Sequence, residues 1–332
     1  MTAATATTTA TTGTAPRGPR GLTWLVLRLH RSALWFWTML LAVSAGALLW
    51  AYGPGADAAR EEFRRMDCGP TGTPSLSCDY AGPAYQNYDL ALALGAGLLT
   101  VAPLLVAAWA GGALTGRELE HGTARLAWVQ SVSPARWLTA KLAVPAVVLT
   151  TGALALTALH RLVWASDGEL RDGWREWHDP TPYVANGPLL IAYLLLGLAV
   201  GVLAGLLLGR ALPALAVAAL TQTALLTALT AARPHLWPAE TLVDKEQYPD
   251  WIGMVVGDGA LTADGARIDD PICVDDARCL AEHEVVGFYR DYHPSGHFWP
   301  LQLMETGIVL AVAALAVLAA FRLLRRRTGA AV

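Results

Sequence analysis

The sequence carries little charge for its length. Only 15% of its 332 residues are Asp, Glu, Lys or Arg, whereas 54% are hydrophobic and the mean hydropathy is +0.39. Soluble domains are about a quarter charged, so this composition excludes both an ordinary soluble protein and a disordered chain. Cysteine is scarce as well, and four residues are too few for a disulfide-rich scaffold of this length.

The sequence also lacks the phosphate-binding motif G-x-x-x-x-G-K-[ST], so we do not expect it to bind ATP in that way or to be an enzyme. No catalytic residues and no nucleic-acid partner are predicted. A metal centre is not expected either, because His283, His293 and His297, near Glu284 and Asp291, lack the spacing of a strong ligand motif. Lysine is rare, since 22 of the 24 basic residues are Arg, which is typical of a GC-rich bacterial genome.

What the sequence does contain is six apolar runs of about 20 residues, each long enough to cross a bilayer. We therefore predict an all-α membrane protein with six transmembrane helices. A Thr/Ala-rich disordered tail (1–21) and an interfacial helix (22–32) are expected before them. The predicted spans are 33–52, 90–112, 137–159, 188–208, 212–232 and 299–324.

Basic residues predict the orientation of these helices. The two termini, the 113–136 segment with Lys141, and the 209–211 turn hold 13 of the 24 Lys and Arg, but only two of the 27 Asp and Glu. Lys and Arg near span ends favour the cytoplasmic side. We expect both termini, including the basic tail 325–332, to be cytoplasmic. Three large loops are then extracellular, and the longest is expected to fold over the mouth of the bundle. These loops are 53–89, 160–187 and 233–298.

All four cysteines lie in the predicted extracellular loops. Cys68 and Cys78 are in the first loop, and Cys273 and Cys279 are in the last. Disulfides persist outside the bacterial cytoplasm but not within it. We favour the two short-range pairs, Cys68–Cys78 and Cys273–Cys279, over cross-loop pairing or free thiols.

The segment between the second and third spans has clear local signals. Gly122 suits a left-handed helix end, and Thr123 can cap a short helix over 124–130. Ser133 followed by Pro134 is typical of a new helix start. The pattern predicts a short helix held across the cytoplasmic ends of two spans, an arrangement that can receive force from a soluble partner.

Two stretches resemble a known family. The pattern E-x-E-x-G-T … S-x-x-R … K between the second and third of six spans is similar to that of ABC-2-type transporter permeases. Here it is formed by Glu118, Glu120, Gly122, Thr123, Ser133, Arg136 and Lys141. Before the last span, HFWPLQLME (297–305) is similar to the FWPxQxxE pattern of permeases from GC-rich Gram-positive bacteria.

The resemblance implies a multi-pass permease subunit in the plasma membrane that requires no cofactor of its own. It implies pairing with a separate ABC ATPase subunit, which would bind ATP, and with a second permease as a homodimer or a mixed pair. Export by alternating access is the expected activity. The residues implied in ATPase coupling are Glu118, Glu120, Gly122, Thr123, Arg125 and Arg136.

Several alternatives stay open. Glu118 and Arg125 can also be read as a solvated helix end in which the two charges balance. A non-transporting membrane sensor or envelope assembly factor, with ligand-binding extracellular loops, remains the alternative to a permease.

Polar residues in the last two spans are the candidates for a substrate path. Thr223, Thr227 and Thr230 lie on one face of the fifth span, with Gln222 beside them. Such side chains tend to face a cavity or the bundle interior, but threonines also bond to their own helix and pack against neighbours. Glu305 can gate or bind a cation at the outer end of the sixth span, or it can lie among hydrated headgroups.

Overall fold

The computed structural model describes residues 21–66, 82–129, 132–166, 168–170, 175–245, 249, 253–273 and 276–329. Within these residues, six helices are long and apolar enough to cross a membrane, which confirms the predicted number of spans. They extend over Arg31–Arg65, Pro83–Glu120, Pro134–Ser166, Leu189–Leu208, Ala211–His235 and Ser295–Thr328. The predicted tail up to residue 20 and the Cys68–Cys78 pair lie outside the described residues.

Two of these spans are composite helices. The first joins α2 (Arg31–Trp50), a π-helical turn (Ala51–Gly55) and α3 (Ala56–Arg65), and the second joins α4 (Pro83–Trp109), the π-helical segment η3 (Ala110–Gly116) and α5 (Arg117–Glu120). The remaining helices of the bundle are α1 (Leu22–Leu29), α6 (Thr123–Val129), α7 (Pro134–Ser166), α8 (Pro180–Ala185), α9 (Leu189–Leu208), α10 (Ala211–Ala232) and α12 (Phe298–Thr328).

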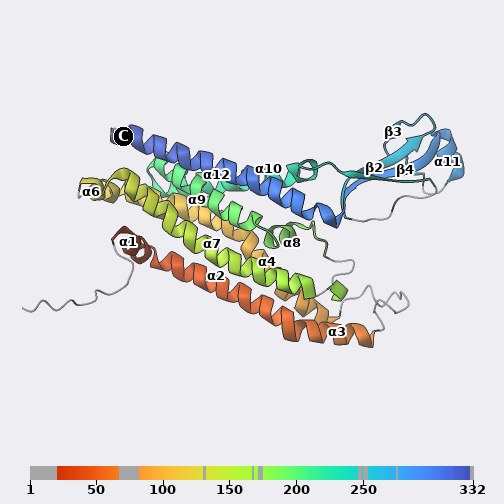
Figure 1. Cartoon of the computed structure of the whole chain (residues 1–332), viewed down its shortest axis with the longest axis horizontal. Coiled ribbons are helices and arrows are strands. Elements are labelled where there is room, and N and C mark those ends of the chain that lie inside the picture. Colours follow the sequence, from red (N-terminus) through yellow and green to blue (C-terminus); the bar gives the residue numbers. More distant parts are fainter. Residues whose placement is uncertain are drawn as a thin grey trace, which may run out of the picture.

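The segment between α10 and α12 contains a β-sheet, so the expectation of an all-α protein is wrong there. Its strands are β1 (Glu240–Asp244), β2 (Met254–Thr262), β3 (Arg267–Ile268) and β4 (Val285–His293), in the antiparallel order β1-β4-β2-β3. β4 contains two Val, two Tyr and one Phe, which suit a half-buried pleated surface. The sheet extends beyond the ends of α10 and α12 instead of folding over the bundle (Figure 1).

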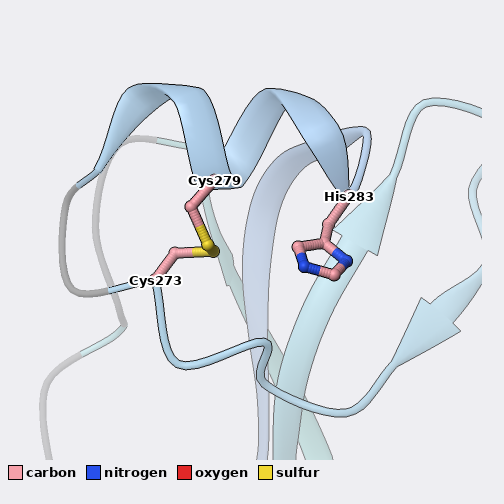
Figure 2. Close-up of side chains that lie close together, drawn as sticks. All are labelled: Cys273, Cys279 and His283. Carbon is pink, nitrogen blue, oxygen red and sulfur yellow. A yellow bond between two sulfur atoms is a disulfide. The ribbon is translucent and has the colours of Figure 1, made fainter.

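The short helix α11 (Ala277–Glu282) is fixed beside the sheet by the predicted Cys273–Cys279 disulfide, which is present (Figure 2). His283 lies next to it. The sulfur atoms of Cys273 and Cys279 and a ring nitrogen of His283 lie within 4.8 Å of one another, close enough to hold a metal ion if the cysteines were free. Metals bind thiolates, whereas both sulfurs here are bonded to each other. The group is therefore a structural crosslink in this state.

Helix α9 forms the centre of the bundle and is buried along nearly its whole length. Three glycines spaced four residues apart, Gly197, Gly201 and Gly205, allow it to approach α4 and η3 closely. A Cβ at Gly201 would lie 2.5 Å from the carbonyl oxygen of Ala107, a distance that no side chain tolerates. This is the small-residue packing of membrane helices, in which close backbone approach supplies the contact energy.

The arrangement of the helices separates two ends of the molecule. Helices α1 and α6 and the C-terminal end of α12 lie together at one end, and the sheet lies at the opposite end (Figure 1). We refer to these as the α6 end and the sheet end. Each end contains a cluster of polar side chains.

Candidate functional site

The chain between α5 and α7 follows most of the predicted local signals. Gly122 has φ +73°, the left-handed conformation expected of it. The Ser133 hydroxyl accepts a hydrogen bond from the Arg136 backbone N–H (3.3 Å) at the start of α7, as predicted. Thr123 does not cap α6 from outside but is its first residue, and its hydroxyl donates to the carbonyl oxygen of Glu118 (3.2 Å). The hydroxyl therefore ties α6 back to α5.

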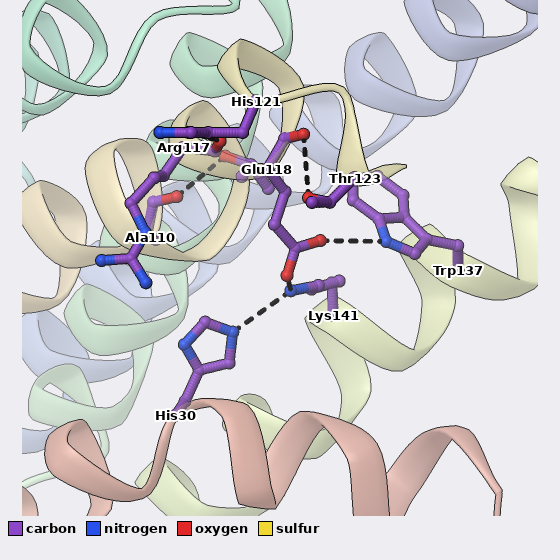
Figure 3. A network of polar contacts seen from close by, with 9 residues as sticks. His30, Ala110, Arg117, Glu118, His121, Thr123, Trp137 and Lys141 are labelled. Carbon is purple, nitrogen blue, oxygen red and sulfur yellow. Dashed lines mark hydrogen bonds and ion pairs between the residues drawn. The ribbon is translucent and has the colours of Figure 1, made fainter. Parts of the chain in front are cut away.

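The carboxylate of Glu118 points into the protein, where it contacts Lys141 and Trp137. Together with His30, which contacts Lys141, these residues form what we call the Glu118 cluster (Figure 3). Lys141 Nζ lies 2.5 Å from Glu118 Oε1, and the indole N–H of Trp137 donates to Oε2 (3.3 Å). The Lys141 ammonium also donates to His30 Nε2 (3.1 Å). The side chain of Lys141 is 3% exposed and that of Glu118 is 19% exposed. Glu118 therefore pairs with Lys141, and the alternative in which it balances Arg125 is wrong.

This cluster joins three spans at the α6 end. His30 precedes α2, Glu118 belongs to the second span, and Trp137 and Lys141 belong to α7. A charged pair this far from water is stable only because each charge has a partner. The position of α5 is consequently coupled to the positions of both neighbouring helices.

Two further side chains, Glu120 and Arg327, hold the tight turn between α9 and α10. Glu120 Oε2 accepts a hydrogen bond from the backbone N–H of Ala211 (2.8 Å), the first residue of α10. From the other side, the guanidinium of Arg327 on α12 donates to the carbonyl oxygens of Leu206 and Leu207 at the end of α9. These contacts satisfy backbone groups that helix ends leave open. They also connect α5 to α10 and α12 to α9.

Helix α6 presents an apolar face to its surroundings. Ala124 is buried, and Trp128 packs edge-to-face on Trp137 with ring centroids 5.6 Å apart. On the outward side, Leu126 is 59% exposed and Val129 is 80% exposed. Arg125, one of the residues predicted for ATPase coupling, is also exposed on α6. The contact of Trp128 with Trp137 anchors α6 to the Glu118 cluster and leaves Leu126 and Val129 on the outward side.

The pKa of His30 is lowered from its ordinary value of 6.5 to about 4, first by burial and then by the positive charges of Lys141 and Arg117. The imidazole is therefore neutral at pH 7, which agrees with its acceptance of a hydrogen bond from the Lys141 ammonium. In an unfolded chain the same group would bind a proton near pH 6.5.

We expect the stability of the protein to fall as the pH drops from 6.5 toward 4. In this window the unfolded chain binds a proton at His30 that the folded protein does not bind, so acid favours unfolding. Thermal melting in detergent across this range measures the effect. His30→Gln keeps a polar side chain without the titration and should flatten the curve. Parallel curves for wild type and variant would contradict the assignment.

A second cluster of buried polar side chains lies toward the sheet end, and we call it the Glu305 cluster. The guanidinium of Arg233 donates to both carboxylate oxygens of Glu305, with Nε 2.8 Å from Oε2 and Nη2 3.2 Å from Oε1. The hydroxyl of Tyr193 also donates to Oε1, and the Tyr183 ring lies 4.0 Å below the guanidinium. The Gln302 amide donates to the carbonyl oxygen of Tyr183 (2.5 Å).

Glu305 is fully buried in this cluster, so the alternative that placed it among hydrated headgroups is wrong. The cause is Arg233, which follows the last turn of α10 and neutralises the carboxylate inside the bundle. Burial also raises the pKa of the Tyr183 phenol, so this group stays protonated. The cluster joins α8, α9, α10 and α12.

The other residues of the predicted substrate path do not share one environment. Gln222 is fully buried and donates to the carbonyl oxygen of Tyr193 (3.3 Å). Thr223, Thr227 and Thr230 are exposed on the outer side of α10, and the Thr223 hydroxyl donates to its own helix at Ala219 (3.0 Å). Within a single chain, these residues therefore do not line one cavity.

The histidines near the sheet connect it to the bundle. The Nδ1 atoms of His293 and His297 lie 3.0 Å apart, His293 Nε2 lies 2.9 Å from the carbonyl oxygen of Pro234, and His297 Nε2 lies 3.3 Å from Glu240. Burial lowers the pKa of His293, which suits a neutral ring in this chain of contacts. These contacts connect strands β1 and β4 to the end of α10 and the start of α12.

Comparison with known proteins identifies a family. A family model described as ABC-2 membrane transporter related matches residues 23–233, from α1 to the end of α10. No curated protein and no solved structure matches the chain significantly. The matched region contains the whole Glu118 cluster and α6, while the sheet and α12 follow it.

Proposed function

The chain belongs to the ABC-2 membrane transporter related family, and from this premise we propose that it is the permease subunit of an ABC exporter. In this proposal a separate ATPase subunit binds and hydrolyses ATP and drives substrate across the membrane. The α6 end is cytoplasmic, as its many arginines favour, and the sheet is extracellular. Two permeases and two ATPases form the working transporter in the plasma membrane.

The observation that carries the proposal is the exposed face of α6 on a rigid support. Leu126 and Val129 form an exposed apolar pair on α6, which the surface of a partner would cover. Trp128 fixes the helix to Trp137, and Trp137 in turn donates to Glu118. A push on α6 is therefore passed to α7 through the ring contact, and through Glu118 to the second span.

The coupling residues implied by the resemblance then divide into two roles. Arg125, with the apolar face beside it, is placed to contact the ATPase. Glu118 and Glu120 are placed to transmit the movement, because their carboxylates bind Lys141 and the start of α10. Gly122 and Thr123 form the bend between α5 and α6, and the Arg136 backbone closes the start of α7.

The exposed threonines of α10 support a paired permease. Thr223 and Thr227 face outward from a single chain, together with Leu220, which is 71% exposed. In a pair of copies, this face would be covered by the second permease and would border the pathway between them. In this proposal the threonines line the substrate path at the interface between the two copies.

The test is the association with the ATPase in the native membrane. We expect Val129→Asp to reduce the amount of ATPase that co-purifies with the permease by about tenfold or more, because a charge is placed in the centre of an apolar contact. Val243→Asp is the matched control, since Val243 is 51% exposed on β1 at the opposite end. Transport-linked ATP turnover is measured on the same samples.

Equal recovery of the ATPase with both variants would remove α6 as the coupling element. Absence of any ATPase with the wild-type protein would favour the non-transporting sensor or assembly factor instead.

A further inference from the structure

A groove of about 420 Å³ lies between α1, α2, α4 and α7 near the α6 end. This volume falls within the range of pockets that hold small molecules, roughly 300–1,000 Å³. Its walls are almost wholly apolar, and Leu29, Phe36 and Leu105 on its rim are each more than 40% exposed. These residues belong to helices long and apolar enough to cross a membrane, or to the helix beside them, so in a membrane the groove would open sideways toward the bilayer.

One end of the groove is polar and positively charged. Arg117 and His30 line it there, beside the Glu118–Lys141 pair (Figure 3). Lys141 is neutralised by Glu118. Among the described residues, by contrast, the Arg117 guanidinium has no hydrogen-bond or ion-pair partner. Arg31, which follows His30 in the chain, is exposed but does not line the groove. The polar end therefore carries net positive charge without an acid to balance it.

The dimensions of the groove match one leaflet of a membrane. From Ser32 to Leu40, the lining residues of α2 cover about 12 Å of helix axis. One leaflet contributes about 15 Å to the hydrocarbon core. A molecule with its charged group at Arg117 would thus place an apolar chain along the groove to roughly the depth of that leaflet.

We propose that this groove binds one anionic phospholipid, with the headgroup phosphate at Arg117 and an acyl chain between α1, α2, α4 and α7. The charge of the polar end and the apolar walls together select this occupant. A zwitterionic lipid leaves the guanidinium less well compensated, and a free phosphate leaves the apolar walls uncovered. His30, neutral and accepting from Lys141 at Nε2, directs its Nδ1–H as a further donor at the polar end.

The placement of this lipid in the cytoplasmic leaflet rests on the proposed function, whereas the binding itself does not. Lipid binding can be measured on the isolated permease in detergent, without ATPase or transport. Failure of the lipid site would leave ATPase association intact, and failure of ATPase association would leave the lipid site intact. The two proposals are therefore separable.

The experiment is native mass spectrometry of the purified full chain in detergent with phosphatidylglycerol, phosphatidylcholine or inorganic phosphate. We expect one phosphatidylglycerol to be retained in preference to phosphatidylcholine, with no displacement by phosphate. Arg117→Gln should weaken retention of phosphatidylglycerol roughly tenfold, the loss expected for one charge-assisted hydrogen bond. Arg117→Lys should keep most of the preference, because the charge remains.

Arg125→Gln is the matched control, since Arg125 is an exposed arginine on α6 outside the groove, and we expect wild-type retention. Ala33→Phe fills the groove and should weaken retention of both lipids, with unchanged melting in detergent showing that the protein is folded. Equal losses for Arg117→Gln and Arg125→Gln would overturn the proposal. Displacement by inorganic phosphate, or equal retention of the two lipids, would overturn it as well.

Discussion

Replacing Glu305 by glutamine will lower the free energy of unfolding by about 3–5 kcal/mol, the cost of breaking a buried ion pair from one side. The Arg233 side chain is 4% exposed and that of Glu305 is 0% exposed. Glutamine keeps the shape but removes the charge, and its amide group presents a donor toward a guanidinium that also donates. Thermal and denaturant unfolding of the purified protein in detergent measures the loss.

The control for this prediction is Glu282→Gln, a glutamate on the exposed surface of α11, which should stay within about 0.5 kcal/mol of wild type. The double variant Arg233→Met with Glu305→Leu removes both charges together. It should recover much of the stability, since a well-packed apolar pair often replaces a buried ion pair without loss. If Glu305→Gln and Glu282→Gln unfold alike, the ion pair does not hold α10 to α12.

The sequence predicts the spans well because hydropathy over about 20 residues depends on composition alone. It places their ends less well. The first span was expected to end at residue 52, whereas the helix continues through Pro54 to Arg65. The added turns are charged and are supported by pairs such as Arg65–Glu61 (3.2 Å). A hydropathy pattern cannot distinguish such a polar extension from a loop.

The sheet could not be predicted from local pattern for a different reason. β1 pairs with β4, which lies more than 40 residues later in the chain, and β2 contains two glycines in nine residues. Each strand is a weak signal by itself, and the sheet is stabilised by pairing across the segment. The close packing of α9 does have a local signal, the four-residue spacing of Gly197, Gly201 and Gly205, although no prediction was made from it.

The polar clusters show which part of a site a sequence reveals. Glu305 and Lys141 stand in or beside predicted spans, and an ionisable residue there signals a buried partner or a function. The identity of the partner is a long-range property. Arg233 is 72 residues from Glu305, and Glu118 is 23 residues from Lys141. The sequence motif therefore identified the segment between the second and third spans. The direction of the Glu118 carboxylate is set by its partners Trp137 and Lys141 on α7, which only the structure shows.

Replacing Glu118 by glutamine will lower the free energy of unfolding by about 3 kcal/mol, the lower end of the range for a broken buried ion pair, because Glu118 keeps some exposure. Lys141 would then remain 3% exposed without its counter-charge. Glu120→Gln is the contrasting variant. Its carboxylate accepts a backbone N–H at an exposed helix start, and the glutamine amide oxygen can still accept this bond, so the variant should cost less than about 1 kcal/mol.

The same variant separates binding of the ATPase from coupling to it. Leu126 and Val129 are untouched by Glu118→Gln, so the ATPase should still co-purify at close to the wild-type level. The link from Trp137 to the second span is weakened, because the indole N–H loses a charged acceptor. Transport-linked ATP turnover should therefore fall more than the amount of bound ATPase. If both fall in proportion, Glu118 acts by holding the fold of α6 and not by transmitting its movement.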